Sequence, residues 1–218
     1  MYRAVLLDVY GTLVHDDETW ATEAAAGIAA RSGADPDDVA RYWSARIWAM
    51  AGSAHGPDFR RLDDLDAASL AETAAHFGTH AGPPRYPAGL PAPYPDSLPF
   101  LAAAGLPVCL VSDADRDRLE PVLHGHGITA AAVVTSEDAR AYKPRPEPFR
   151  MALRLLGLAA GDVLHIGDSP AADLAGANNL GIDTAFVRRD DRPLPPGVTA
   201  TYTVDTLTGL LPVLGDAR

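Results

Sequence analysis

The 218-residue sequence is poor in several features that point to particular classes of protein. Its single cysteine, Cys109, excludes a disulfide framework. Only 18 basic residues stand against 29 acidic ones, and the net charge of −11 argues against nucleic acid and anionic membranes as partners. The apolar run at residues 4–7 is broken by Asp8 and is too short for a signal peptide or a membrane span. We therefore expect a cytoplasmic protein without a targeting segment.

Proline is concentrated between residues 82 and 95. Because proline fixes φ and disfavours helix interiors and central strands, we interpret this stretch as an ordered connector. With 47% hydrophobic residues, the chain can bury one sizeable core and a smaller accessory unit. We predict a main domain formed by residues 1–14 and 94–218, and an inserted helical unit with the connector at residues 15–93.

Apolar periodicity and turn residues predict helices before the connector and alternating strands and helices after it. The expected helices cover residues 18–31, 36–50, 62–77, 95–104, 115–124, 146–156, 171–180 and a last one from 206. The expected strands cover residues 4–7, 107–111, 133–135, 163–166 and 184–187. Alternation of this kind predicts an α/β fold, a doubly wound, Rossmann-like parallel sheet with a small helical insertion.

Chemically active side chains follow several of the predicted strands directly. Asp8 ends the first strand, and Gly11 behind it allows a tight turn. Ser112 follows the second strand, Asp168 follows the strand at 163–166, and Lys143 lies in a loop after the strand at 133–135. Ligands of open parallel sheets bind beyond the carboxyl ends of the strands, so we expect these side chains to form one site. Taken alone, Asp8 has an alternative interpretation: it could be an N-capping aspartate at the end of a strand, without a chemical role.

Lys143 is the only lysine among the 18 basic residues. A chain that otherwise uses arginine retains one lysine here, which suggests a need for a compact ammonium group rather than a planar guanidinium. A chance surface lysine is the alternative, but the position in this loop favours a functional role.

Together these residues resemble the four motifs of the haloacid dehalogenase-like (HAD) hydrolase superfamily. Asp-x-Tyr-Gly-Thr-Leu from Asp8 is similar to the first motif, Ser112 to the second, Lys143 to the third, and Asp168 with Asp173 to the fourth. The resemblance covers nearly the whole chain, and the inserted helices are similar to the family's small helical cap. It implies that Asp8 is a nucleophile that forms a covalent aspartyl intermediate.

The resemblance also implies a Mg²⁺ ion held by Asp8, the backbone carbonyl of Tyr10 and Asp168, an all-oxygen set that suits this metal. Ser112 and Lys143 would bind the transferring group. Two clustered carboxylates would repel an anionic substrate, so a cation is required if phosphate binds.

Further substrate contacts are expected from both predicted domains. Thr12 and Asp113 flank the first two motifs of the main domain. Arg41 and Arg46 are candidate anion contacts from the insertion, although most helix arginines are simply solvated.

Tyr10 departs from the phosphatase pattern of the family, which usually has a second aspartate there to protonate the leaving group. That role needs a group that titrates near neutral pH, and tyrosine has a reference pKa of roughly 10. The sequence around Tyr10 resembles instead the family's 2-haloacid dehalogenases, which release halide and need no such acid. In a phosphatase, His15, Asp16, another cap residue or the substrate would have to supply the proton.

The fourth motif favours the phosphatase interpretation. Metal-independent dehalogenases typically show Ser-Ser-Asn where this chain has Ile166-Gly167-Asp168. Ser112-Asp113 departs from the Ser-Asn pair common to both branches. A buried carboxylate without a cation costs several kcal/mol, whereas a missing general acid costs only rate, about 10²–10⁴-fold.

We therefore predict a Mg²⁺-dependent phosphatase that acts on a small phosphorylated metabolite. A metal-independent 2-haloacid dehalogenase and a non-catalytic binder of a phosphorylated ligand are the alternatives. The expected partner is a small anionic substrate, with neither nucleic acid nor membrane. The sequence leaves the substrate's identity and the oligomeric state open, with a homodimer among the options.

Overall fold

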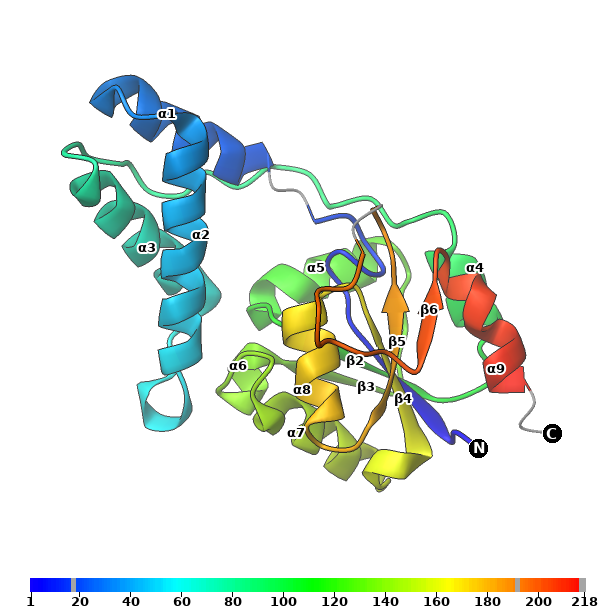
Figure 1. Ribbon diagram of the computed structural model, residues 1–218. Helices are drawn as coiled ribbons and strands as arrows, with labels where there is room; N and C mark the ends of the chain where they lie inside the picture. The colour runs from blue at the N-terminus through cyan, green and yellow to red at the C-terminus, as the bar shows by residue number, and fades with distance from the viewer. Residues whose placement is uncertain (17–18, 191–192, 216–218) are drawn as a thin grey trace. The chain divides into compact units, whose positions relative to one another are not determined.

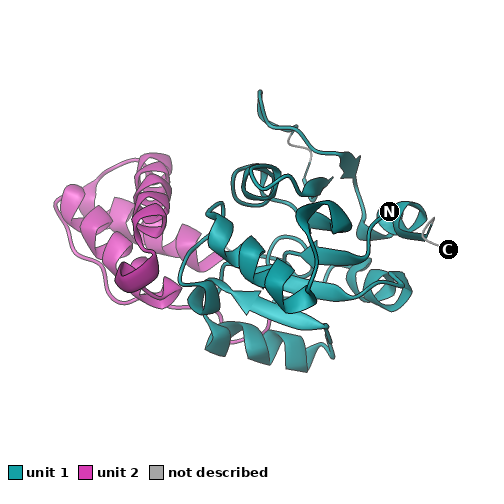
Figure 2. Ribbon diagram, turned by 90° about the horizontal axis from the view of Figure 1, so that it is seen from below, with its two compact units in different colours: residues 1–16, 91–218 teal, residues 17–90 magenta. Residues whose placement is uncertain are grey.

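The computed structural model describes residues 1–16, 19–190 and 193–215. The chain forms two compact units, Met1–Asp16 with Pro91–Arg218, and Asp17–Leu90 (Figure 2). The sequence predicted that the first segment of the larger unit ends at residue 14 and that the smaller unit ends at residue 93. In the structure these two boundaries lie at residues 16 and 90.

The larger unit is built on one parallel sheet with the strand order β3-β2-β1-β4-β5-β6 (Figure 1). The strands are β1 Ala4–Leu7, β2 Val108–Ser112, β3 Ala132–Thr135, β4 Val163–Gly167, β5 Asp183–Val187 and β6 Tyr202–Val204. The order reverses between β1 and β4, which is the Rossmann arrangement and confirms the predicted fold class. The sequence did not indicate β6, a three-residue edge strand in which no side chain is fully buried.

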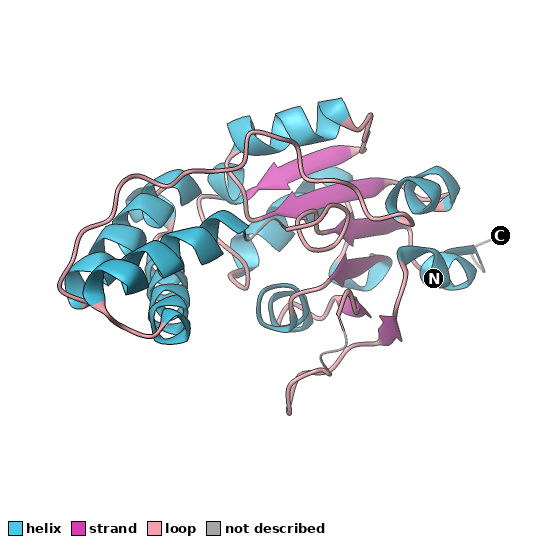
Figure 3. Cartoon of the chain, turned by 90° about the horizontal axis from the view of Figure 1, so that it is seen from above, coloured by secondary structure: helices cyan, strands magenta, loops and turns pink. Residues whose placement is uncertain are grey.

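Helices cover both faces of this sheet, so the fold is doubly wound (Figure 3). They are α4 Ser97–Ala103, α5 Arg116–Gly125, α6 Ser136–Ala139, α7 Pro146–Leu156, α8 Ala175–Asn178 and α9 Leu211–Gly215, with short turns η2 Ala160–Asp162, η3 Pro170–Leu174 and η4 Leu207–Leu210. Along β1, Val5 and Leu7 face a core with Phe100 of α4, whereas Leu6 faces a second core with Phe149 of α7. The strand is buried on both sides, as parallel strands are.

Two predicted helices of this unit are divided in the structure. The helix expected at 171–180 consists of the π-turn η3 followed by α8, and the helix expected from 206 begins with the 3₁₀ turn η4. Pro170 opens η3, and the Ser169 hydroxyl caps it by accepting the backbone N–H of Ala172 at 3.2 Å. π-turns inside helices are frequent at functional sites, and this one carries Asp173.

The smaller unit contains the helices α1 Thr19–Ser32, α2 Pro36–Ser53 and α3 Leu62–His76 and the short turn η1 Gly56–Asp58. Its core includes Ile28, Val39, Trp43 and Leu70. Asp35 caps α2 by accepting the backbone N–H of residue 37 at 2.8 Å, as Pro36 at the first helical position suggests. Among the described residues, no helix combines the length and apolar character needed to span a bilayer.

Candidate active site

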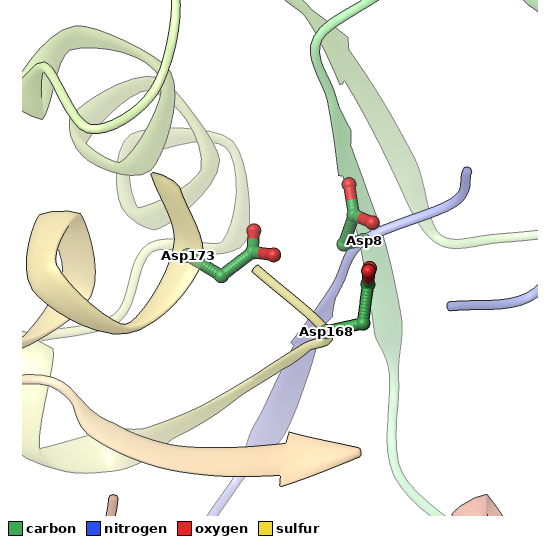
Figure 4. Close-up of side chains that lie close together, drawn as sticks. All are labelled: Asp8, Asp168 and Asp173. Carbon is green, nitrogen blue, oxygen red and sulfur yellow. The ribbon is translucent and has the colours of Figure 1, made fainter. Parts of the chain in front are cut away.

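Three carboxylates meet at the carboxyl edge of the sheet, at the point where the strand order reverses. Asp8 follows β1, Asp168 follows the neighbouring β4, and Asp173 projects from η3. One carboxylate oxygen from each lies within 4.8 Å of the other two (Figure 4). Asp8 is 5% exposed, Asp173 is fully buried and Asp168 is half-buried, so this is the only one of the three with an open side.

Two glycines make the approach of these carboxylates possible. Gly11 has φ +78°, and a Cβ atom there would lie 2.6 Å from Oδ2 of Asp168. A Cβ atom on Gly167 would lie 2.3 Å from Asp173. Real Cβ contacts are not this short, so a side chain at either position would displace the neighbouring carboxylate.

Lys143 is the cation of the site. Its side chain is 3% exposed, and its Nζ atom donates to Asp8 Oδ1 at 2.6 Å, to Asp173 Oδ1 at 2.6 Å and to the carbonyl of Val111 at 3.3 Å. Burial alone would lower the pKa of Lys143, but Asp173, Asp8 and Asp113 hold it well above the ordinary value. The three ammonium hydrogens are therefore all used in fixing one position.

The three carboxylates differ in pKa because burial and the neighbouring charges act on each of them to a different extent. Burial raises the pKa of Asp8, against the opposing effect of Lys143. Burial and the charges of Asp8 and Asp173 raise the pKa of Asp168 to about 7. Burial also acts on Asp173, but Lys143 and His165 lower its pKa below the ordinary value.

Asp173 accepts more hydrogen bonds than the sequence suggested. Besides Lys143, its Oδ1 atom lies 3.0 Å from Nε2 of His165, and its Oδ2 atom accepts the backbone N–H of Ser169 at 3.0 Å. His165 was missed by the sequence analysis. The sequence did contain one indication of its role, because His165 interrupts the apolar run of β4, where buried strands normally carry apolar residues.

Ser112 is 2% exposed, and its Oγ atom is buried without a hydrogen-bond partner among the described residues. Native structures rarely leave a buried hydroxyl unsatisfied, which is consistent with a missing ligand at this point. Asp113 beside it accepts the backbone N–H of Lys143 at 3.0 Å, and burial raises its pKa to about 7.

Thr12 and Tyr10 flank Gly11 on the turn behind β1. Thr12 is fully buried and donates its hydroxyl to Asp168 Oδ1 at 2.8 Å, so in the free protein it orients a carboxylate. Tyr10 is partly buried, and burial raises the pKa of its phenol to about 12. This phenol is therefore even less suited to proton transfer near neutral pH than a free tyrosine.

The two arginines predicted from the insertion lie on α2 of the smaller unit. Arg41 is exposed and forms an ion pair with Asp38, and Arg46 donates to Glu72 Oε2 at 2.5 Å. Their expected role in substrate binding stays a prediction. In the larger unit, His15 stacks against Tyr94 with a distance of 3.9 Å between ring centroids.

A family model described as haloacid dehalogenase-like hydrolase matches residues 2–181 of this chain. The chain therefore belongs to the HAD-like hydrolases. The resemblance inferred from the motifs is therefore confirmed.

Relatives of known name fall into both branches of the family. A phosphoglycolate phosphatase of Rhodospirillum rubrum is 30% identical over 84% of this chain and 78% of its own length. The (S)-2-haloacid dehalogenase of Xanthobacter autotrophicus is 32% identical over 44% of this chain and 40% of its own. A HAD-like domain-containing protein 3 of Danio rerio is 40% identical over 44% of this chain. The chain spans only 40% of the length of that last relative.

Solved structures from both branches share the fold. The L-2-haloacid dehalogenase of Xanthobacter autotrophicus superposes with a TM-score of 0.73 at 20% identity, with complete coverage of both chains. A HAD phosphatase of Thermococcus onnurineus gives 0.68 at 22% identity, covering 99% of this chain and 98% of its own. The fold alone does not distinguish phosphatase from dehalogenase, because one scaffold hosts several chemistries.

Proposed function

We propose that this hydrolase is a Mg²⁺-dependent phosphatase that acts on a small phosphorylated metabolite through an aspartyl intermediate. The observation that carries this proposal is the cluster of three carboxylates within 4.8 Å. Lys143 balances only one of their charges, which leaves an excess of two negative charges when all three are ionised. An anionic substrate could approach such a site only if a further cation were bound.

The side chains suit Mg²⁺ because they offer oxygen atoms alone, and Asp168 keeps an open side. Asp8, Asp168 and the expected carbonyl of Tyr10 would hold the ion. When bound, it would offset negative charge on the phosphoryl oxygens and the carboxylates.

In the proposed reaction, a carboxylate oxygen of Asp8 attacks the phosphorus atom, and the bond from phosphorus to the leaving oxygen breaks. Lys143 holds Asp8 in place and offsets charge on the transferring group. The hydroxyl of Ser112, which has no partner among the described residues, would donate to one phosphoryl oxygen. Water then attacks the phosphorus of the aspartyl phosphate, releasing inorganic phosphate and regenerating Asp8.

The leaving oxygen must gain a proton, and Tyr10 is a poor source because its pKa is raised to about 12. The remaining candidates are His15, Asp16, another residue of the cap or the substrate itself. A substrate whose leaving group departs readily without protonation suits this site best.

The same observation at Tyr10 supports the alternative, a 2-haloacid dehalogenase, since halide leaves without a proton. The dehalogenase relative adds to this support. A non-catalytic binder of a phosphorylated ligand is the third candidate. We also propose a cytoplasmic location, a small anionic substrate, no nucleic-acid or membrane partner, and a homodimer as one option.

A paired turnover assay tests the proposal. Phosphate release from a panel of phosphoesters, with Mg²⁺ and with EDTA, is compared with chloride release from L-2-chloropropionate. We expect Mg²⁺-dependent phosphate release that is lost in Asp8→Asn. Chloride release that is indifferent to EDTA would establish the dehalogenase instead. Thermal stabilisation by phosphorylated ligands without any product would favour the binder.

A further inference from the structure

His165 is a fully buried polar side chain within an otherwise apolar layer of the fold. It lies on β4, and its ring packs edge-on against Phe149 of α7 with 5.0 Å between ring centroids. Burying an imidazole in such surroundings is unfavourable unless its nitrogens are paired. Only Nε2 has a partner, and Nδ1 is buried without one among the described residues. Packing alone does not explain this residue.

The partner of His165 links it to the nucleophile. Nε2 lies 3.0 Å from Oδ1 of Asp173, and a carboxylate can only accept, so the histidine donates. The same Oδ1 atom accepts from Lys143 at 2.6 Å, and Lys143 donates to Asp8 at 2.6 Å. These contacts form one unbroken hydrogen-bonded chain of four side chains from β4 to the end of β1.

Asp173 needs this support because it stands on η3 rather than on the sheet. Its other bonds are to Lys143, which lies in a loop, and to the backbone of Ser169 at the start of η3. Among the residues that the structure describes, His165 is the only donor to Asp173 that comes from a strand. It therefore fixes the carboxylate, and through it the ammonium group, relative to the sheet that also carries Asp8.

We propose that His165 is a positioning residue, which orients Asp173 so that the ammonium group of Lys143 is held against Asp8. For its effect on turnover, this inference rests on the proposed phosphatase function. The placement of Lys143 does not depend on that function and can be measured separately.

The single lysine of the chain makes a direct test practical. Labelling with ¹⁵N-lysine yields one side-chain ammonium signal, which reports on Lys143 without substrate. His165→Leu removes the donor, whereas His165→Gln replaces it with an amide N–H. We expect the signal to shift and to exchange faster with water in His165→Leu, and to return toward the wild-type position in His165→Gln. Cys109→Ala, a truncation in the same buried core, is the packing control and should leave the signal unchanged.

Phosphate release by the full chain with Mg²⁺ is the second readout. We expect kcat/KM to fall about 10- to 100-fold in His165→Leu, in line with other residues that orient catalytic groups, and to recover largely in His165→Gln. An unchanged lysine signal in His165→Leu would overturn the proposal, as would a folded His165→Gln that behaves like His165→Leu in both readouts. If the wild type releases no phosphate, the proposed function fails, and the lysine signal alone decides the role of His165.

Discussion

Lys143 is held by three acceptors in a space with almost no solvent access. The Nζ atom of Lys143 donates to Asp8 and to Asp173 at 2.6 Å each. The guanidinium group of arginine is larger and planar, so it cannot reproduce both contacts from one nitrogen atom. We expect Lys143→Arg to lose at least about 100-fold in kcat/KM although the charge is kept. Overpacking should also lower the free energy of unfolding by about 1–3 kcal/mol.

Steady-state kinetics and urea unfolding of Lys143→Arg check both statements. Arg154→Lys, the reverse exchange at an exposed position of α7, is the matched control. It should change neither kcat/KM nor the free energy of unfolding. Near wild-type turnover in Lys143→Arg would mean that charge alone matters at this position.

Gly11 offers a second test at the residue scale, because another glycine shares its conformation without its neighbours. Gly11 and Gly33 have φ of +78° and +77°, but only Gly11 would bring a Cβ atom against Asp168. Both alanine variants should lose about 1–2 kcal/mol of stability through the left-handed backbone. Only Gly11→Ala should also weaken Mg²⁺ binding.

Urea unfolding and isothermal titration with Mg²⁺ separate the two effects of Gly11→Ala. Equal Mg²⁺ affinity in the two glycine variants would contradict the close approach of residue 11 to the carboxylate.

At the scale of elements, one carboxylate joins three segments of the larger unit. Asp96, before α4, accepts two hydrogen bonds from Arg189 at 2.9 and 3.0 Å and one from the backbone N–H of Leu207 at 2.6 Å. Arg189 follows β5 and also donates to the carbonyl of Thr12. Burial alone would raise the pKa of Asp96, but Arg189 and Leu207 lower it below 3.8.

This lowered pKa predicts a pH dependence of stability. The carboxylate is more acidic in the folded than in the unfolded chain, so its contribution is complete above the unfolded pKa and is lost as pH falls through the folded one. We expect Asp96→Asn to cost about 1.5–3 kcal/mol at neutral pH. The cost should shrink as the pH falls below 3.8.

Urea unfolding of wild type and Asp96→Asn at several pH values measures this cost. A difference in unfolding free energy that stays constant with pH would show that the charge of Asp96 is not what joins these segments.

At the scale of the whole molecule, the carboxylate cluster couples metal binding to folding. Only the folded chain brings Asp8 and Asp168 together, so Mg²⁺ should bind the native state alone and stabilise it. At about 100 times Kd the free energy of unfolding should rise by about 2.7 kcal/mol. The rise should vanish in Asp168→Asn and persist in Asp37→Asn, which changes an exposed acid on α2.

Thermal unfolding with and without Mg²⁺ checks this coupling and needs no substrate. A melting temperature of the wild type that is insensitive to Mg²⁺ would argue against the metal site and strengthen the dehalogenase interpretation.

Much of this architecture was predictable because its signals are local. Each of the strands β1, β2 and β4 is a short apolar run that ends in an acidic or hydroxyl residue close by in the sequence. Asp8, Ser112 and Asp168 could therefore be assigned to one edge of a parallel sheet. The edge strand β6 and the division of the helix at η3 could not be predicted, because a three-residue strand without a buried side chain and a π-turn leave no distinct apolar periodicity.

The fold class, the family motifs and the residue types at the sheet edge could be predicted without the structure. These follow from short-range patterns and from one unusual lysine. The folded chain settles which atoms meet: Asp173 accepts from both Lys143 and His165, Thr12 orients Asp168, and the Ser112 hydroxyl has no partner among the described residues. These contacts join residues between 8 and 156 positions apart in the chain, and their distances depend on sheet order and helix packing rather than on local sequence.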